Sequence, residues 1–395
     1  MKANLNRRAF LAQTGGYVAA ATGLGLLQAS QSHAVEERAW PKAGDLPLTV
    51  IKGKPRERGR QYGEHFADAI ARFLENEIVK PFGSSTKRED MLAYGAECSH
   101  VIKEYSPEIF DELEGMAEGS RLKLEELVAV TLHEEFYHQG KLPKADHCTA
   151  IAAGPPDTDD KNTYVGQTWD WFMSLYGVSQ MLLWQRNEGP SLLTYAYPGL
   201  WVGAGMNSEG LAFCWTSTHG LDIPSPRVGI PSYVLIAHML YQKTLKDAVE
   251  EVRRAKHAGW FTIVLADGQG KLANIEGSPK DLAVEYHEGH LARVYYGSRK
   301  MTGTPEGKPV PYHERCQLMY TMLEKSKGKL NAEAMQGLLS DKKICSCQAV
   351  KEPREVRTLD AMLFNTTKRE ALVTRGPVGE HPWQRFTFDE AKSRK

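Results

Sequence analysis

Cys148 has the most reactive side chain in this sequence, and its position is unusual. It opens the stretch CTAIAA, whose small and branched apolar residues predict a β-strand, and it follows His147 at the end of a polar loop. A thiolate attacks carbonyl carbons readily, whereas a buried strand thiol behaves as a small packing residue. The position therefore predicts either a nucleophile at the start of a strand or an inert core cysteine.

Asp170 is the second candidate, in the stretch TWDW one predicted hairpin after Cys148. Trp169 and Trp171 flank it, and a carboxylate in such apolar surroundings needs a hydrogen-bonding or charged partner. A turn aspartate is the alternative. The two tryptophans also predict a binding site for an apolar or aromatic group, although tryptophans are more often plain core residues.

Two other polar stretches do not support metal binding. In HEEFYH, His133 and His138 are five residues apart, whereas a helical zinc motif needs histidines four apart on one face, so we expect surface or hydrogen-bonded histidines at a helix end. The stretch DTDDKN, residues 157–162, lacks the glycine and distal glutamate of a calcium loop and predicts a hairpin turn. No glycine-rich phosphate motif follows a predicted strand, so we expect no cofactor and no metal.

Charge and cysteine content narrow the function further. The chain has 395 residues with 49 basic and 49 acidic side chains, which argues against a nucleic-acid partner and favours a small-molecule substrate. Its six cysteines have no convincing disulfide or zinc spacing, and Cys345 and Cys347 are separated by a single residue. We expect most of these thiols to be structural.

The first 34 residues predict a twin-arginine export signal. Arg7 and Arg8 precede a weakly apolar, glycine- and alanine-rich run that ends with the small residues Ser32 and Ala34. No later segment is apolar for about 20 residues, the length that spans a bilayer. The expected mature protein therefore starts at Val35, has no membrane span, and is periplasmic or secreted.

The remaining sequence predicts an α+β fold with an N-terminal helical segment. Apolar residues recur at helical spacing through much of residues 45–140, after one strand-like stretch. From Cys148 onward, short β-rich runs separated by turn residues alternate with a helical pair near 231–256 and a helix near 312–326. This order predicts two sheets packed face to face with helices outside them, a four-layer αββα arrangement.

Several stretches, taken in order, resemble the acyl-coenzyme A:6-aminopenicillanic acid acyltransferase family of autoproteolytic cysteine hydrolases. The resemblance covers roughly residues 45–390 and rests on PRERGRQYG, ELEGMAEGSRLKLEELVAV, HCTA, YVGQTWDW, GMNSEGLA, IEGSP, HERCQLM and ICSCQ. It implies the αββα Ntn-hydrolase sandwich, in which the nucleophile becomes the first residue after self-cleavage. The chain would then be cut between His147 and Cys148 into segments 35–147 and 148–395, which stay associated.

The same resemblance implies roles for four residues. Cys148 would be the nucleophile, with its freed α-amino group as the base, and Asp170 would accept hydrogen bonds from that amino group. Asn207 in GMNSEG would donate to an oxyanion, with a plain turn role as the alternative. Arg315 in HERCQLM would lie near the thiolate and favour it, with an exposed helix arginine as the alternative.

The implied activity is cleavage or transfer of an acyl group from an amide or thioester through an acyl-cysteine intermediate. Two departures from the family pattern keep another class of protein open. His147 stands where relatives commonly have glycine, and the stretch RVYYGSRKM lacks an asparagine that many relatives carry there. The alternative is an exported, non-catalytic small-molecule-binding protein that has kept the fold.

Overall fold

The computed structural model describes residues 45–83, 86–139, 148–217, 227–294, 314–348, 350 and 352–389. These residues all belong to one compact unit, Trp40–Lys395. The predicted export signal, residues 1–34, and His147 lie outside the described residues. None of the described helices combines the length and the apolar character needed to cross a membrane.

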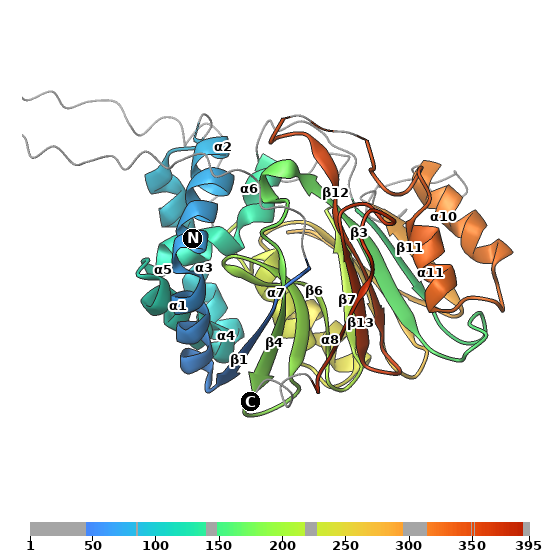
Figure 1. Cartoon of the computed structure of the whole chain (residues 1–395). Coiled ribbons are helices and arrows are strands. Elements are labelled where there is room, and N and C mark those ends of the chain that lie inside the picture. The colour runs from blue at the N-terminus through green and yellow to red at the C-terminus, as the bar shows by residue number, and fades with distance from the viewer. Residues whose placement is uncertain are drawn as a thin grey trace, which may run out of the picture. The chain divides into compact units, whose positions relative to one another are not determined.

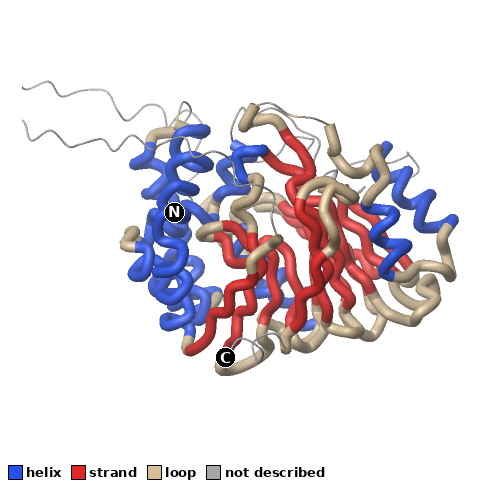
Figure 2. Tube along the Cα trace, viewed as in Figure 1, coloured by secondary structure: helices blue, strands red, loops and turns tan. Residues whose placement is uncertain are grey.

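Two β-sheets form the centre of the unit (Figures 1 and 2). The first sheet has the order β1-β4-β5-β6-β7-β8-β9-β10. Its strands are β1 (Leu48–Gly53), β4 (Gln180–Arg186), β5 (Leu192–Tyr197), β6 (Leu200–Asn207), β7 (Ala212–Thr216), β8 (Phe261–Ala266), β9 (Leu272–Gly277) and β10 (Leu282–His287). β1 pairs with β4 in parallel, and the other pairings are antiparallel.

The second sheet is antiparallel and has the order β11-β2-β3-β12-β13-β14. Its strands are β2 (Thr149–Ala153), β3 (Tyr164–Phe172), β11 (His290–Val294), β12 (Val356–Asn365), β13 (Glu370–Arg375) and β14 (Gln384–Thr387). The turn predicted at residues 157–162 lies between β2 and β3, as expected.

The sheets pack face to face, and helices cover their outer faces. β2 and β3 contact β7 and β8 between the sheets. α7 (Ser232–Leu240) packs on β6 and against α8 (Leu245–Arg254), whereas α10 (Glu314–Lys325) packs on β11 and α11 (Ala332–Leu339) on β12. Every residue of β3 is buried, because both of its faces are covered. The predicted four-layer αββα sandwich is confirmed.

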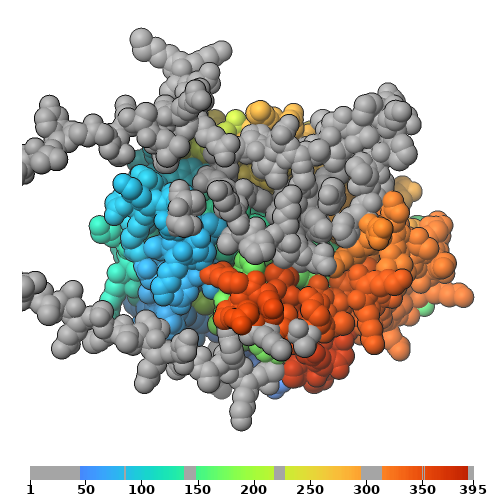
Figure 3. All heavy atoms as spheres, turned by 90° about the horizontal axis from the view of Figure 1, so that it is seen from above, coloured from blue at the N-terminus to red at the C-terminus, as the bar shows by residue number. Residues whose placement is uncertain are grey.

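The N-terminal segment is helical apart from β1, as its periodicity predicted. Its helices are α1 (Pro55–Phe73), α2 (Lys80–Phe82), α3 (Arg88–Tyr105), α4 (Pro107–Ser120), α5 (Leu124–Thr131) and α6 (His133–Gln139). A π-helical turn, Leu74–Val79, joins α1 to α2. These helices and the α10–α11 pair lie on opposite sides of the compact unit (Figure 3).

Four glycines explain two of the N-terminal stretches named above. A Cβ on Gly59 would lie 2.0 Å from the carbonyl oxygen of Glu112, and one on Gly119 would lie 2.2 Å from that of Arg60. Gly63 and Gly115 are equally close to the facing helix. PRERGRQYG and ELEGMAEG therefore provide a close crossing of α1 and α4, which is a packing role.

Candidate active site

Cys148 and Asp170 are brought together by the β2–β3 hairpin. β2 pairs with β3 so that Thr149 lies opposite Thr168, and Cys148 immediately precedes β2. The backbone N–H of Asp170 donates to Cys148 Sγ at 3.4 Å, and the thiol donates to the carbonyl oxygen of Asp170 at 3.8 Å. Cys148 is only 7% exposed. Its thiol therefore sits against the Asp170 backbone.

The Asp170 carboxylate is buried in a polar cluster behind this hairpin. Thr358 Oγ1 donates to Asp170 Oδ1 at 2.5 Å, Ser346 Oγ donates to Oδ2 at 3.4 Å, and Arg315 Nη1 lies 3.5 Å from Oδ2. Burial raises the pKa of Asp170 to about 6, although Arg315 and Thr358 act in the opposite direction. The carboxylate is therefore mostly ionised above pH 6 and mostly protonated below it.

Arg315 is a buried residue of α10, not an exposed helix arginine. It is 8% exposed, and its described ion pair is with Asp170. The ICSCQ stretch closes the cluster from another side, because the backbone N–H of Ser346 donates to Thr358 Oγ1 at 2.9 Å. The structure thus brings Cys148, Asp170 and Arg315 together, with Arg315 in contact with the carboxylate.

A narrow pocket lies against Cys148. Its wall is mainly aromatic, and the lining residues are Phe73, His133, Glu134, Cys148, Trp169, Trp171, Leu175, Tyr197, Leu200, Trp215, Ser217 and Tyr233. Alternation along β3 places both tryptophans of TWDW in this wall and leaves Asp170 facing α10. Trp169 and Trp171 therefore occupy the position expected of an apolar or aromatic binding site.

The intact chain keeps the thiol protonated. Burial raises the pKa of Cys148, and the negative charge of Asp170 raises it further. Since only the thiolate is strongly nucleophilic, Cys148 in this state needs a nearby base or cation before it can react.

The HEEFYH stretch contributes to the pocket, which the sequence analysis missed. His133 is buried between the rings of Phe73 and Trp171, with centroids 5.4 and 5.5 Å away, and its Nδ1 has no hydrogen-bond partner among the described residues. Burial lowers the pKa of His133 to about 3, so the ring is neutral. The expectation of a surface or hydrogen-bonded histidine was wrong at this position, because α6 begins at His133 inside the unit and not at its surface.

Glu134 is the second missed residue. It lines the pocket and accepts a hydrogen bond from Ser217 Oγ, and burial raises its pKa to about 8. The signal available in the sequence was a pair of adjacent glutamates, Glu134 and Glu135, next to apolar helix residues. The described residues contain no group of three His, Cys, Asp or Glu side chains placed to hold a metal ion.

Asn207 is not brought to Cys148. Leu200 at the start of β6 lines the pocket, whereas Asn207 ends the same strand about 20 Å further along. Its Nδ2 donates to the carbonyl oxygens of Leu240 and Gln242, and its Oδ1 accepts from the backbone N–H groups of Glu209 and Leu211. These bonds use both amide protons, so the geometry supports the turn role that was the alternative.

Comparison with known proteins gives matches over most of the chain. Residues 157–377 match the family model described as acyl-coenzyme A:6-aminopenicillanic acid acyl-transferase. The acyl-coenzyme A:6-aminopenicillanic-acid-acyltransferase 40 kDa form of Emericella nidulans is 22% identical over 340 residues, covering 83% of this chain and 92% of the relative.

Two solved structures are also similar. A variant of the conjugated bile acid hydrolase of Clostridium perfringens has 12% identity and a TM-score of 0.45, covering 62% of this chain and 93% of that chain. Penicillin V acylase from Agrobacterium tumefaciens has 10% identity and a TM-score of 0.39, covering 58% and 83%. The family model spans more than half of the sequence, and the chain therefore belongs to the acyl-coenzyme A:6-aminopenicillanic acid acyl-transferase family.

Proposed function

We propose that this protein is an exported, self-cleaving cysteine enzyme that takes the acyl group of an amide onto Cys148 and passes it to water or to an amine. The observation that carries the proposal is the position of Cys148, at the first residue before β2, with its thiol against both Asp170 and an aromatic pocket. Family membership supports acyl-group chemistry at this site.

Self-cleavage supplies the base that the protonated Cys148 thiol lacks in the intact chain. In self-cleavage, Cys148 Sγ attacks the His147 carbonyl carbon, the bond from that carbon to the Cys148 nitrogen breaks as the acyl group moves to sulfur, and water hydrolyses the thioester. A carboxylate remains on His147 and a free α-amino group on Cys148, and such an amino group has an ordinary pKa of about 8, close to working pH. The neutral amine takes the thiol proton, and the resulting ammonium stabilises the thiolate. Asp170, anchored by Thr358 and Arg315, then accepts hydrogen bonds from the amino group and orients it.

The reaction proceeds in two steps. The thiolate attacks the amide carbonyl carbon, a carbon–sulfur bond forms, and the carbon–nitrogen bond breaks as the leaving amine takes the proton held by the α-amino group. Water or a second amine then attacks the acyl-cysteine and restores the thiol. The aromatic wall, including Trp169, Trp171 and Trp215, favours an apolar or aromatic acyl group.

Hydrolysis is the favoured outcome, because residues 1–34 predict export and coenzyme A esters are scarce outside the cytoplasm. Transfer to an amine is the second candidate. It is supported by the name of the Emericella nidulans relative, which is an acyltransferase. Mixing purified protein with an amide and a competing amine, and measuring free acid against new amide, separates the two.

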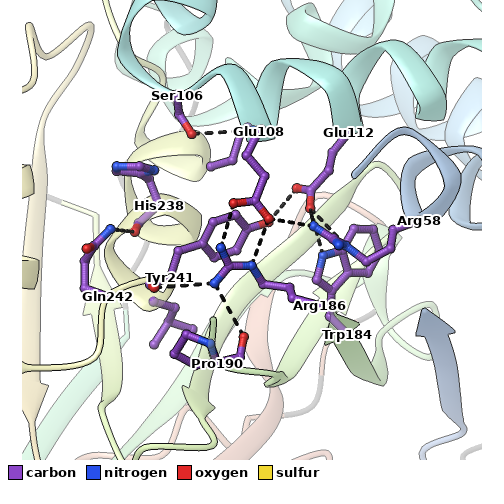
Figure 4. A network of polar contacts seen from close by, with 12 residues as sticks. Arg58, Ser106, Glu108, Glu112, Trp184, Arg186, Pro190, His238, Tyr241 and Gln242 are labelled. Carbon is purple, nitrogen blue, oxygen red and sulfur yellow. Dashed lines mark hydrogen bonds and ion pairs between the residues drawn. The ribbon is translucent and has the colours of Figure 1, made fainter. Parts of the chain in front are cut away.

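The two proposed segments have strong reasons to stay associated. β1 of segment 35–147 pairs in parallel with β4 of segment 148–395. A buried polar network also joins the segments (Figure 4). In it, Glu112 accepts from Arg58 at 2.5 Å, from Trp184 Nε1 at 3.1 Å and from the Tyr241 hydroxyl at 2.5 Å. Cutting one peptide bond leaves all of these contacts in place.

Mass spectrometry of the purified protein tests self-cleavage. Wild-type protein should give two fragments divided at Cys148, whereas Cys148→Ala should accumulate as one chain without amidase activity. Cys148→Ser should cleave slowly or not at all, because a hydroxyl is far less ionised than a thiol. Cleavage of Cys148→Ala at the same bond would assign the cut to a separate protease. A single wild-type chain starting at Val35 would favour the alternative, a non-catalytic binding protein, which the presence of His147 in place of glycine suggests.

Export has its own test. Replacing Arg7 and Arg8 together by lysine should leave the protein in the cytoplasm, because twin-arginine export depends on the arginine pair. Fractionation of the producing cells, with the wild-type chain as control, measures this. Equal export of both forms would contradict the assignment of residues 1–34.

A further inference from the structure

Tyr197, in the wall of the Cys148 pocket, is the end of a buried chain of hydroxyl groups that crosses between the sheets. Its hydroxyl lies 2.8 Å from the Tyr195 hydroxyl, and Tyr195 donates to Asp360 Oδ2 at 2.5 Å. Tyr195 and Tyr197 belong to β5, whereas Asp360 belongs to β12 of the other sheet. All three side chains are buried.

Asp360 determines the direction in which these hydrogen bonds run. An ionised carboxylate can only accept, so the Tyr195 proton points to Asp360, and the Tyr197 proton must then point to Tyr195. Ser179 Oγ also donates to Asp360 at 2.8 Å, and Arg375 Nη1 lies 3.6 Å from its Oδ1. Burial raises the pKa of Asp360 to about 6, which leaves it ionised at pH 7.5.

This direction makes the Tyr197 hydroxyl a hydrogen-bond acceptor in the pocket. The Tyr197 proton is used in the bond to Tyr195, and no other residue of the described ranges donates to the Tyr197 hydroxyl oxygen, which keeps an acceptor site. Tyr197 and Cys148 line the same pocket. An acceptor at this place favours a ligand that brings a hydrogen-bond donor close to the nucleophile.

We infer that Tyr197 accepts a hydrogen bond from the N–H of the scissile amide, and so selects amides over esters and thioesters as acyl donors. The inference rests on the proposed function. An amide carries its N–H directly on the carbonyl carbon that Cys148 attacks, whereas the corresponding ester oxygen or thioester sulfur has no hydrogen. Tyr195 and Asp360 are positioning residues, since they act only through the direction of the Tyr197 proton.

A matched pair of substrates tests the assignment. The phenylacetyl p-nitroanilide and the phenylacetyl p-nitrophenyl ester share one acyl group and differ at the leaving atom. Tyr197→Phe should lower kcat/KM for the anilide about 5- to 10-fold, the value of one neutral hydrogen bond, and change the ester less than about twofold. The ratio of the two values is independent of the fraction of folded enzyme.

Reversing the chain of hydrogen bonds is the sharper experiment. In Asp360→Asn, Arg375 should hold the amide oxygen, which places the amide NH₂ against Tyr195. The protons of Tyr195 and Tyr197 then turn towards the pocket, where a donor opposes the anilide N–H but suits the ester oxygen. The anilide-to-ester ratio should fall at least as far as in Tyr197→Phe.

Tyr195→Phe is the substitute experiment if Asp360→Asn does not fold. It breaks the chain of hydrogen bonds, leaves the Asp360–Arg375 pair in place, and should also lower the anilide-to-ester ratio. Tyr105→Phe is the matched control, because its hydroxyl donates to the Glu251 carbonyl in the helical layer. An equal loss of kcat/KM on both substrates in Tyr197→Phe would overturn the inference. It would show that the Tyr197 hydroxyl bonds to a group of the enzyme and not to the N–H of the substrate. Wild-type protein that cleaves neither substrate would contradict the proposed function, and the inference with it.

Discussion

Two buried polar regions of this molecule differ in how completely their hydrogen bonds are satisfied. In the network of Figure 4, both carboxylate oxygens of Glu112 accept, and Arg58 donates to Glu112, to Glu108 and to the carbonyl oxygen of Gly53. In the Cys148 pocket, by contrast, several buried nitrogen atoms have no hydrogen-bond partner among the described residues: His133 Nδ1, Trp169 Nε1 and Trp215 Nε1.

This difference separates a stabilising region from a binding region. Buried polar groups are nearly always hydrogen-bonded in folded proteins, so a group of unsatisfied ones beside a nucleophile indicates room for a ligand's polar atoms. The satisfied network has no such room and joins α1 and α4 to β4 and Tyr241. Substitutions around Cys148, in the pocket and in the Asp170 cluster behind it, should therefore change turnover. Substitutions in the network of Figure 4 should change stability.

The largest effect on turnover after loss of Cys148 is expected for Asp170→Asn. Turnover should fall roughly 100-fold or more, because the α-amino group loses the carboxylate that orients it. In wild-type protein, turnover should also fall in acid as Asp170 takes up a proton. The pKa of Asp170 is about 6 in the intact chain, and the positive α-amino group of the cleaved chain lowers it. Initial rates between pH 4.5 and 8 measure both effects.

Asp160→Asn is the control for Asp170→Asn, because Asp160 lies in the turn at the other end of the same hairpin and bonds to Tyr164. It should leave turnover near the wild-type value. Unchanged turnover in Asp170→Asn would give Asp170 a purely structural role and remove the distinction between the two regions.

Arg315→Met should have a smaller effect, and a diagnostic one. Because the Arg315 charge lowers the pKa of Asp170, its loss should raise that pKa and move the acid limb of the pH–rate profile to higher pH. Turnover at pH 6.5 should fall about tenfold and recover partly at pH 8. An alkaline shift of iodoacetamide alkylation with an unmoved acid limb would show that Arg315 acts on the Cys148 thiolate instead.

Arg58→Met should leave the turnover of folded molecules unchanged and lower stability by about 3–5 kcal/mol, because it leaves Glu112 as a buried charge without its cation. Thermal or urea unfolding measures this. The double variant Arg58→Met, Glu112→Leu removes both charges and should recover much of the loss. A drop in turnover per folded molecule would mean that the network also serves the site.

Asn207→Ala is expected to have the smallest effect. It removes the amide that ties the end of β6 to Leu240 and Gln242, and should cost about 1–3 kcal/mol of stability. Its kcat/KM should stay within about twofold of the wild-type value. A 100-fold loss of turnover without unfolding would restore the oxyanion role suggested by the sequence.

Local sequence was sufficient for features that depend on neighbouring residues. Thr244 caps α8 by accepting from the backbone N–H of Asp247 at 3.1 Å, a bond that depends only on two residues three apart in the sequence. The turn at residues 157–162 likewise follows from its own composition and places Asp170 beside Cys148 through a single hairpin. Apolar spacing and turn signals predicted most of the strands and helices in their order, but not α11 or β14.

Only the tertiary structure decided what lies across from each element. Strand periodicity shows that Trp169 and Asp170 face opposite sides, but not that Arg315 of α10 meets the carboxylate. The burial of His133 and Glu134 depends on where α6 packs, and the Tyr195–Asp360 contact depends on two sheets meeting face to face. Sequence specifies these contacts only through the packing of distant segments, which no local pattern records.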